Sequence, residues 1–156
     1  MRTQSVSTLL FVLLLLGFSA TVLAAGFPEA CAGTYLTQEG SGAQSIWTFG
    51  KDGSFLGTSS TQRVFNFSNQ QGVWENDGGG NTKGVFLDFS FDASGALLNI
   101  GRVDVVFHTV GHGCANIAGS FSLRFFEAGE DPLNPSSDTG TPITDTFTGR
   151  RLSVAH

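Results

Sequence analysis

Charged residues are scarce in this chain, and basic residues are the scarcer sign. Asp, Glu, Lys and Arg make up 13% of the 156 residues, against about a quarter in an average soluble domain. Eight Lys and Arg against thirteen Asp and Glu give a formal net charge of −5. Because nucleic-acid binding needs a basic face that neutralises phosphates, we expect no nucleic-acid partner.

Cysteine is also rare, since the chain holds only two. This number excludes a disulfide-dense miniprotein, and the low charge excludes a charged coiled coil. Hydrophobic residues reach 40%, which excludes disorder caused by low hydrophobicity. The chain is instead rich in glycine and phenylalanine, with 21 and 15 residues. At this length we expect one folded domain.

The first 24 residues have the pattern of a secretory signal peptide. Arg2 supplies the positive charge, residues 9–18 form an apolar run, and Val22 and Ala24 precede a cleavage point. The run is too short to cross a bilayer about 30 Å thick as a helix. We predict a helical signal peptide at 1–24 and a secreted or periplasmic domain at 25–156, with no stable membrane insertion after cleavage. An uncleaved anchor is the alternative.

The rest of the chain consists of short β-rich runs separated by clusters of Gly, Asn, Asp and Ser. The runs predict eight strands, at residues 33–37, 45–49, 54–59, 72–75, 84–91, 96–108, 115–126 and 145–154. Sequential hairpins without a crossover helix predict an all-β fold, an eight-stranded antiparallel up-and-down barrel, because closure removes exposed edges. A two-sheet sandwich is the alternative.

Strand order also predicts the two ends of the barrel. If consecutive strands alternate in direction, the long connections 61–71 and 127–144 lie at one end and form an open mouth, while most tight turns gather at the other. Cys31 and Cys114 both fall at the tight-turn end. In an exported chain we therefore expect a Cys31–Cys114 disulfide, with two separate buried thiols as the alternative.

Apolar and polar residues alternate along the later strands, which is typical of a sheet wetted on one face. Val85, Leu87, Phe89 and Phe91 share one face of the run 84–91, and we expect that face to lie inside. Equivalent positions on other strands complete an apolar lumen. Its expected lining residues are Trp47, Phe49, Phe55, Trp74, Phe89, Phe91, Val105, Phe107, Phe121 and Leu123.

The opposite faces carry four charged residues, Asp88, Arg102, Asp104 and Arg124. With the apolar faces inside, these charges lie on the solvated exterior, where opposite charges pair across neighbouring strands. If the polar face pointed inward instead, the four would form a charged set able to do acid–base work.

A His-x3-His-x-Cys pattern at His108, His112 and Cys114 invites a metal interpretation. The spacing aligns two histidines on a helix, but this segment is predicted to be a strand that runs into a glycine turn. Cys114 is also expected in the disulfide. We therefore expect no metal site and no cofactor.

The opening of the first predicted strand, AGTYL at 32–36, resembles the Gly-x-Trp signature of lipocalins and the wider calycin group. Residues 33–58 also resemble the first three strands of avidin-type barrels, and much of 25–156 resembles small secreted bacterial lipocalin-like proteins. The resemblance implies a barrel closed at one end, where Arg150 or Arg151 packs over Tyr35 in a structural role. Tyr35 replaces the signature Trp, and the chain has only two Trp, so biotin binding is not carried over.

An eight-stranded lumen is just wide enough to be filled by side chains or to hold one small ligand. An aromatic lining predicts non-covalent binding of a small hydrophobic or aromatic molecule. One alternative is an isomerase or cyclase resembling allene oxide cyclase, which would use the four charged residues. Another is a secreted interaction module whose barrel is filled.

Overall fold

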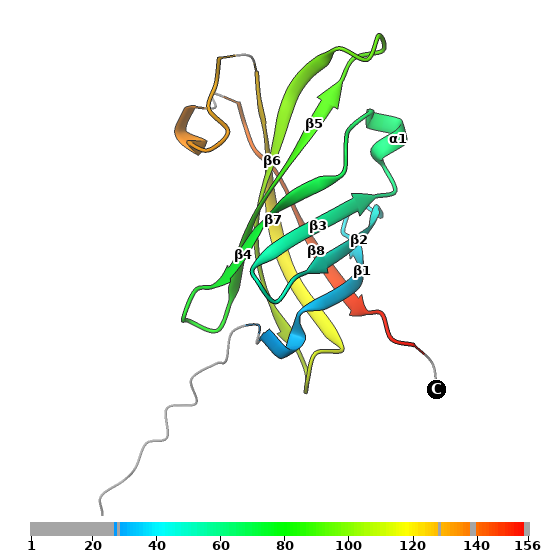
Figure 1. Ribbon diagram of the computed structural model, residues 1–156, viewed down its shortest axis with the longest axis vertical. Coiled ribbons are helices and arrows are strands. Elements are labelled where there is room, and N and C mark those ends of the chain that lie inside the picture. The colour runs from blue at the N-terminus through cyan, green and yellow to red at the C-terminus, as the bar shows by residue number, and fades with distance from the viewer. Residues whose placement is uncertain (1–26, 28, 128, 138–139, 155–156) are drawn as a thin grey trace, which may run out of the picture.

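The computed structural model describes residues 27, 29–127, 129–137 and 140–154 (Figure 1). The predicted signal peptide lies outside the described residues. No helix within the described part of the chain is long and apolar enough to span a membrane.

Eight antiparallel strands close into one barrel in the order β1 to β8, with β8 pairing back onto β1. This arrangement confirms the predicted up-and-down barrel over the sandwich. The strands are β1 Gly33–Glu39, β2 Gln44–Phe49, β3 Ser54–Ser59, β4 Gln70–Asn76, β5 Thr82–Phe91, β6 Leu97–Val110, β7 Asn116–Phe126 and β8 Ile143–Arg151. Three short helical segments are η1 Glu29–Cys31, α1 Gln62–Phe65 and η2 Pro135–Ser137.

The tight turns follow the chemistry that the sequence indicates. Between β2 and β3, Gly53 adopts a φ of 82°, which a residue with a Cβ rarely takes. The Asp52 carboxylate accepts a hydrogen bond from the Ser54 backbone N–H at 3.0 Å. The β5–β6 turn has the same arrangement: Gly95 has a φ of 85°, and the Asp92 carboxylate accepts a hydrogen bond from the Ser94 backbone N–H at 2.8 Å. Such side-chain bonds hold the hairpins in register.

The barrel has one tall wall and one short wall. Strands β5, β6 and β7 contain 10, 14 and 11 residues, whereas β2 and β3 contain six each. Figure 1 shows the β5–β6 hairpin rising above the rest, with α1 and the connection before β8 at the same end. The connections predicted to form the mouth therefore gather at this upper end.

Aromatic rings fill the opposite, closed end. Phe27 is fully buried, and its ring lies 5.2 Å from Phe107, 5.3 Å from Trp74 and 5.4 Å from Phe49, measured between centroids. Its backbone N–H donates to Thr82 Oγ1 at 3.1 Å. Phe27 precedes the first strand, so no strand pattern could have identified it as the floor of the barrel.

The predicted disulfide is confirmed, since Cys31 and Cys114 are bonded beneath this floor. The buried Tyr35 hydroxyl lies 2.9 Å from the Cys31 carbonyl oxygen and 3.0 Å from that of Cys114. Arg151 is opposite Tyr35 in the β1–β8 register, and its Nη2 donates to the Ala32 carbonyl at 2.8 Å. Arg150 is exposed on the outer face, so the structure gives the closing position to Arg151.

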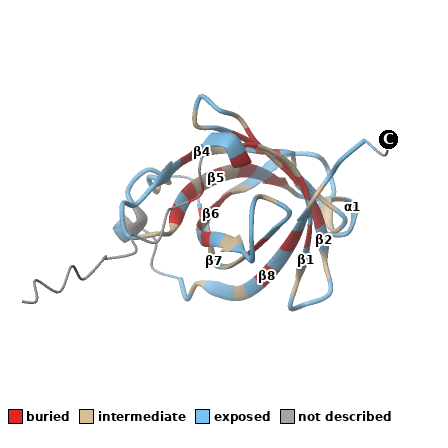
Figure 2. Cartoon of the chain, turned by 90° about the horizontal axis from the view of Figure 1, so that it is seen from below, coloured by how far each residue is buried: buried red, intermediate tan, exposed pale blue. Residues whose placement is uncertain are grey.

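The expected orientation of β5 is wrong. Burial alternates strictly along the strand, and the buried set is Thr82, Gly84, Phe86, Asp88 and Ser90. Figure 2 shows the same alternation of buried and exposed segments around the closed ring of strands. Phe86 stacks on Phe55, with ring centroids 3.3 Å apart. The register pairs Phe86 with Val103, which puts both side chains inside.

Val85, Leu87, Phe89 and Phe91 consequently occupy the outer face of β5, and Phe89 is 50% exposed. The reason is that one fully buried Phe, flanked by Gly84, fits the narrow interior, whereas four large apolar side chains would not. Counting apolar residues on each face of a strand therefore gives the wrong face here. Neither Phe89 nor Phe91 is on the lumen face of β5.

Candidate functional site

The predicted lumen residues divide into three groups. Six are inward and buried, and they pack on one another and fill the closed half: Trp47, Phe49, Phe55, Trp74, Val105 and Phe107. Phe121 and Leu123 face inward but are only partly buried. Phe89 and Phe91 face outward, as described above. The closed half is thus a packed aromatic floor, and only the mouth half leaves inward apolar surface uncovered.

The uncovered apolar surface belongs to β7. Phe121 and Leu123 are opposite Val105 and Val103 of β6, which face inward. Phe125 continues the same face toward the mouth and is 41% exposed. These three side chains form the apolar wall of the candidate site.

A polar cluster lies on the inner faces of the neighbouring strands β4, β5 and β6. We call Gln70, Asp88, Ser90 and Asn99 the luminal polar cluster. Gln70, Asp88 and Ser90 are 9%, 6% and 8% exposed. In the β5–β6 register Ser90 is opposite Asn99, and Asp88 is opposite Gly101. The wall of the mouth half is therefore apolar on β7 and polar across β4 to β6.

Gly101 and Gly57 make room for this cluster. A Cβ on Gly101 would lie 2.5 Å from Asp88 Oδ1, and one on Gly57 would lie 2.8 Å from Gln70 Oε1. A larger residue at either position would push the polar side chain aside. A glycine inside a strand often marks such a close approach, and this is the one signal in the sequence that could have located the cluster.

Burial raises the pKa of the Asp88 carboxyl to about 6, and a side-chain hydrogen bond from Gln70 acts in the opposite direction. Desolvation disfavours the charged form of a carboxyl. Near neutral pH the barrel therefore holds an anionic group in a poorly solvated position, which is typical of functional sites.

Three buried polar atoms among the described residues lack a hydrogen-bond partner: Trp47 Nε1, Gln70 Oε1 and Asn99 Oδ1. Such atoms are rare because each carries a desolvation cost. Trp74, in the closed end, provides a contrast, since its Nε1 donates to the Gly50 carbonyl at 2.9 Å. The unpaired atoms lie on the lumen-facing sides of their strands: Trp47 and Gln70 both flank Gly57 in the register.

A second carboxyl faces the lumen from the short wall. Glu39 lies on the inward face of β1, and its carboxylate accepts hydrogen bonds from the Ser41 and Ser45 hydroxyls at 3.3 and 3.4 Å. Burial is the main cause that raises its pKa, and the nearby Asp145 carboxylate adds to the effect. Burial thus draws the Asp88 and Glu39 carboxyls toward the protonated form. Hydrogen bonds from the Thr146 and Ser41 backbone N–H groups instead lower the pKa of Asp145, which is opposite Phe121 on the inward face of β8.

The other three predicted charged residues lie on the outside of the barrel. The Arg102 guanidinium forms an ion pair with Asp104 at 2.7 Å and donates from Nη1 to the Pro132 carbonyl at 2.7 Å. Arg124 is opposite Arg102 in the register and shares this outer face. Asp88 is inside, so placing it with the exterior charges is wrong. The barrel wall separates it from the others, and the four do not form one acid–base site.

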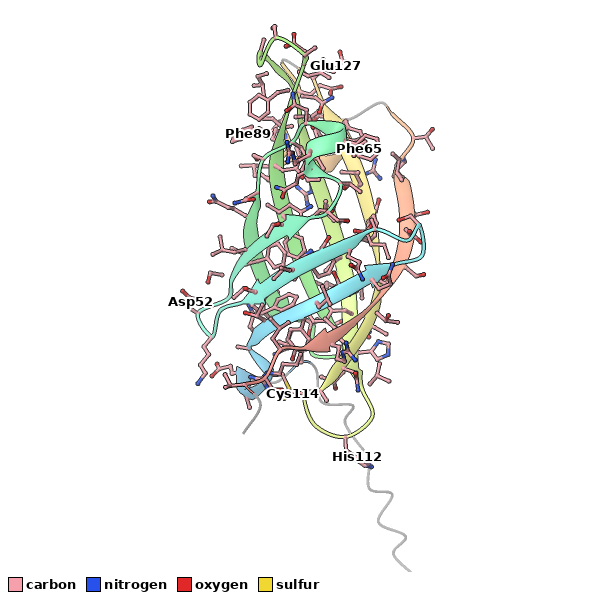
Figure 3. All side chains as sticks on the ribbon, turned by 90° about the vertical axis from the view of Figure 1, so that its right-hand side faces the viewer. Asp52, Phe65, Phe89, His112, Cys114 and Glu127 are labelled. Atoms are coloured by element: carbon pink, nitrogen blue, oxygen red, sulfur yellow. A yellow bond between two sulfur atoms is a disulfide. The ribbon has the colours of Figure 1, made fainter. Side chains whose placement is uncertain are left out.

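The residues of the histidine pattern do not converge either. His108 is exposed on β6, His112 is exposed in the turn after it, and Cys114 is in the disulfide. Figure 3 places His112 and Cys114 at the closed end, far from Phe65 and Glu127 at the mouth. Within the described ranges, no group of three or more His, Cys, Asp and Glu side chains is arranged to hold a metal ion.

Two hollows lie along β1, β7 and β8, with volumes of about 430 and 550 Å³. Outward-facing polar side chains such as Gln38, Asn116 and Thr148 contribute much of their lining. Glu39 lines the second hollow, but neither hollow is lined by a residue with an unpaired buried polar atom, so the chemically distinctive region remains the mouth half of the lumen.

The chain matches no protein-family model, and no curated protein or solved structure matches it either.

Proposed function

We propose that the barrel binds one small organic molecule non-covalently in the mouth half of its lumen. The observation that carries this proposal is the inward β7 wall, where Phe121, Leu123 and Phe125 keep exposed apolar surface above a packed aromatic floor. Covering such surface contributes about 25 cal/mol per Å² before the costs of association. The apolar body of the ligand would rest on this wall.

The rim of the mouth supports the same proposal. Val64 and Phe65 on α1, Leu97 and Leu98 on the β5–β6 hairpin, and Leu133 in the last connection are all exposed. Figure 3 shows Phe65, Phe89 and Glu127 at this upper end. Exposed apolar side chains that gather around an opening are typical of ligand entry sites.

Binding of a neutral apolar dye, N-phenyl-1-naphthylamine, tests the proposal by its fluorescence increase. Leu123→Trp fills the mouth half and is expected to weaken dye binding at least tenfold. Leu56→Trp is the matched control, because Leu56 is exposed on the outer face of β3 and its replacement is expected to leave the affinity unchanged. Equal affinity in both variants, or no binding by the native protein, would overturn the proposal.

We also propose that the protein is exported. The sequence pattern at 1–24 and the Cys31–Cys114 disulfide support this, because structural disulfides persist in oxidising compartments. The mass of the protein recovered from the exported fraction tests it: loss of the first 24 residues is the expected result, and an intact N-terminus would contradict it.

A further inference from the structure

We infer that the ligand is an organic cation, in which a protonated amine or amidine group is attached to an aromatic or aliphatic body. This inference rests on the proposed function and names the chemistry of the same site. The cationic group would meet Asp88 and Gln70, and the body would lie against the β7 wall.

The first reason is that no cationic side chain among the described residues pairs with Asp88 in the lumen. Burial and the Gln70 hydrogen bond are the causes that set its pKa, and neither is a positive charge. Arg102, on the adjacent strand, points to the outer face and pairs with Asp104. Arg151, on the inward face of β8, is at the closed end near Ala32. A buried carboxylate without a cation is costly, and a charged ligand offsets that cost.

The second reason is that two of the three unpaired buried atoms among the described residues are acceptors of this cluster, whereas the third, Trp47 Nε1, is a donor. Gln70 is nine-tenths buried, and its Oε1 points over Gly57 into the barrel without a partner. Asn99 Oδ1 is a second buried acceptor without a donor. Together with the Asp88 carboxylate, these atoms need N–H groups. An ammonium offers three donors and no acceptor, and an amidinium offers several in a fixed plane.

The surroundings favour the same ligand. Glu39 adds a second carboxyl on the opposite wall. An anionic ligand would meet the Asp88, Glu39 and Asp145 carboxyls and two unpaired acceptors, against one unpaired donor, Trp47 Nε1, so we expect its exclusion.

Three probes with one phenyl body test the charge preference: 2-phenylethylamine, 2-phenylethanol and 3-phenylpropionate. Titration calorimetry at pH 7.5 is expected to show the amine binding at least tenfold more tightly than the alcohol, with the carboxylate weakest. Asp88→Asn should make amine and alcohol bind within about twofold of each other. Asp104→Asn removes an identical side chain from the outer face and should keep the full preference.

The pH profile provides a second measurement. From β4 and β6, the residues facing Asp88 are Gln70, Asn99 and Gly101, which do not titrate. Glu39 faces the lumen from β1 and Asp145 from β8, and the lowered pKa of Asp145 keeps it charged over this range. Because pairing with an ammonium stabilises the charged carboxylate, amine binding should release a proton near pH 6. Its affinity should rise from pH 5 to pH 7 and then level off. This rise should disappear in Asp88→Asn and persist in Glu39→Gln.

Gln70→Leu gives an independent test that leaves Asp88 in place. We expect it to reduce amine affinity at least threefold and to leave that of the alcohol unchanged. If the alcohol or the carboxylate binds the native protein as tightly as the amine, the inference is overturned. If none of the three probes binds but the naphthylamine dye does, the cation inference falls while lumen binding stands. If the dye also fails to bind, both fall.

Discussion

The closed end and the mouth of this barrel are built on opposite principles. At the closed end, Trp74 Nε1, the Tyr35 hydroxyl and the Arg151 guanidinium all bond to backbone carbonyls. At the mouth, Gln70 and Asn99 keep buried oxygens without partners, and Asp88 is a buried carboxyl. The paired groups stabilise the closed end, whereas the unpaired groups mark the mouth half as the place where the proposed ligand would supply the missing partners.

Removing the disulfide should break the closed end most severely. The cysteines are 83 residues apart, and in the chain-entropy model opening so long a loop costs about 4–5 kcal/mol of stability. We expect Cys31→Ser combined with Cys114→Ser to lower the free energy of unfolding by this amount, measured by urea denaturation. Dye binding by the fraction that remains folded should be unchanged, since the mouth is at the other end. Weaker binding by that folded fraction would show that the two ends are coupled.

Phe27→Ala should have the next largest effect. The side chain is fully buried among aromatic rings, and truncating such a Phe costs about 3–5 kcal/mol. Phe89→Ala is the control, because Phe89 is half exposed on the outer face, and its cost should stay below about 1 kcal/mol. Similar urea midpoints for the two variants would contradict the role of Phe27 as the floor.

Asp88→Asn should act in the opposite direction and stabilise the protein. The pKa of about 6 in the folded protein lies above the ordinary value of 3.8. Ionisation of Asp88 therefore lowers the free energy of unfolding as the pH rises from about 4 to 6, and the loss persists at higher pH. After allowance for partial solvent contact, the loss is about 2 kcal/mol. We therefore expect Asp88→Asn to be about 2 kcal/mol more stable than the native protein at pH 7.5 and nearly equal to it at pH 4. Urea denaturation at both pH values checks this, and an equal difference at both would contradict it.

The smallest effect is expected outside the barrel. Asp104 is partly exposed and pairs with Arg102, and such pairs contribute up to about 1 kcal/mol. Asp104→Asn should lower the free energy of unfolding by no more than this, and high salt should reduce the difference further. A loss above 2 kcal/mol would mean that the Arg102 contact to Pro132 depends on this carboxylate.

The strands were predictable because turn chemistry marks their ends. Gly53 and Gly95 adopt positive φ, and Asp52 and Asp92 accept hydrogen bonds from the backbone of the same turns. Clusters of these two residue types therefore predict turns. Closure and the disulfide then followed from strand order. The turns depend on residues close together in the chain. Closure and the disulfide depend only on how many times the chain reverses direction between strands.

The orientation of β5 and the identity of the site were not predictable in the same way. Whether Phe86 or Phe89 lies inside depends on which side chain fits beside Phe55 and Gly84 once the barrel has closed, and this is a matter of volume rather than pattern. Reversing the face of β5 exchanged an apolar lining for Asp88 and Ser90. A single misplaced face thus changes the expected ligand from a purely apolar molecule to one with a polar group.

The buried Phe27 side chain closes the lower end of the barrel. Three residues lie between Phe27 and Cys31, which is bonded to Cys114 on the barrel, so the Phe27 backbone can move only about 14 Å from that anchor. Leaving and re-entering the floor is therefore an intramolecular event with a high effective concentration. We therefore expect the closed end to reseal promptly after any brief opening, so that a bound small molecule would enter and leave through the mouth.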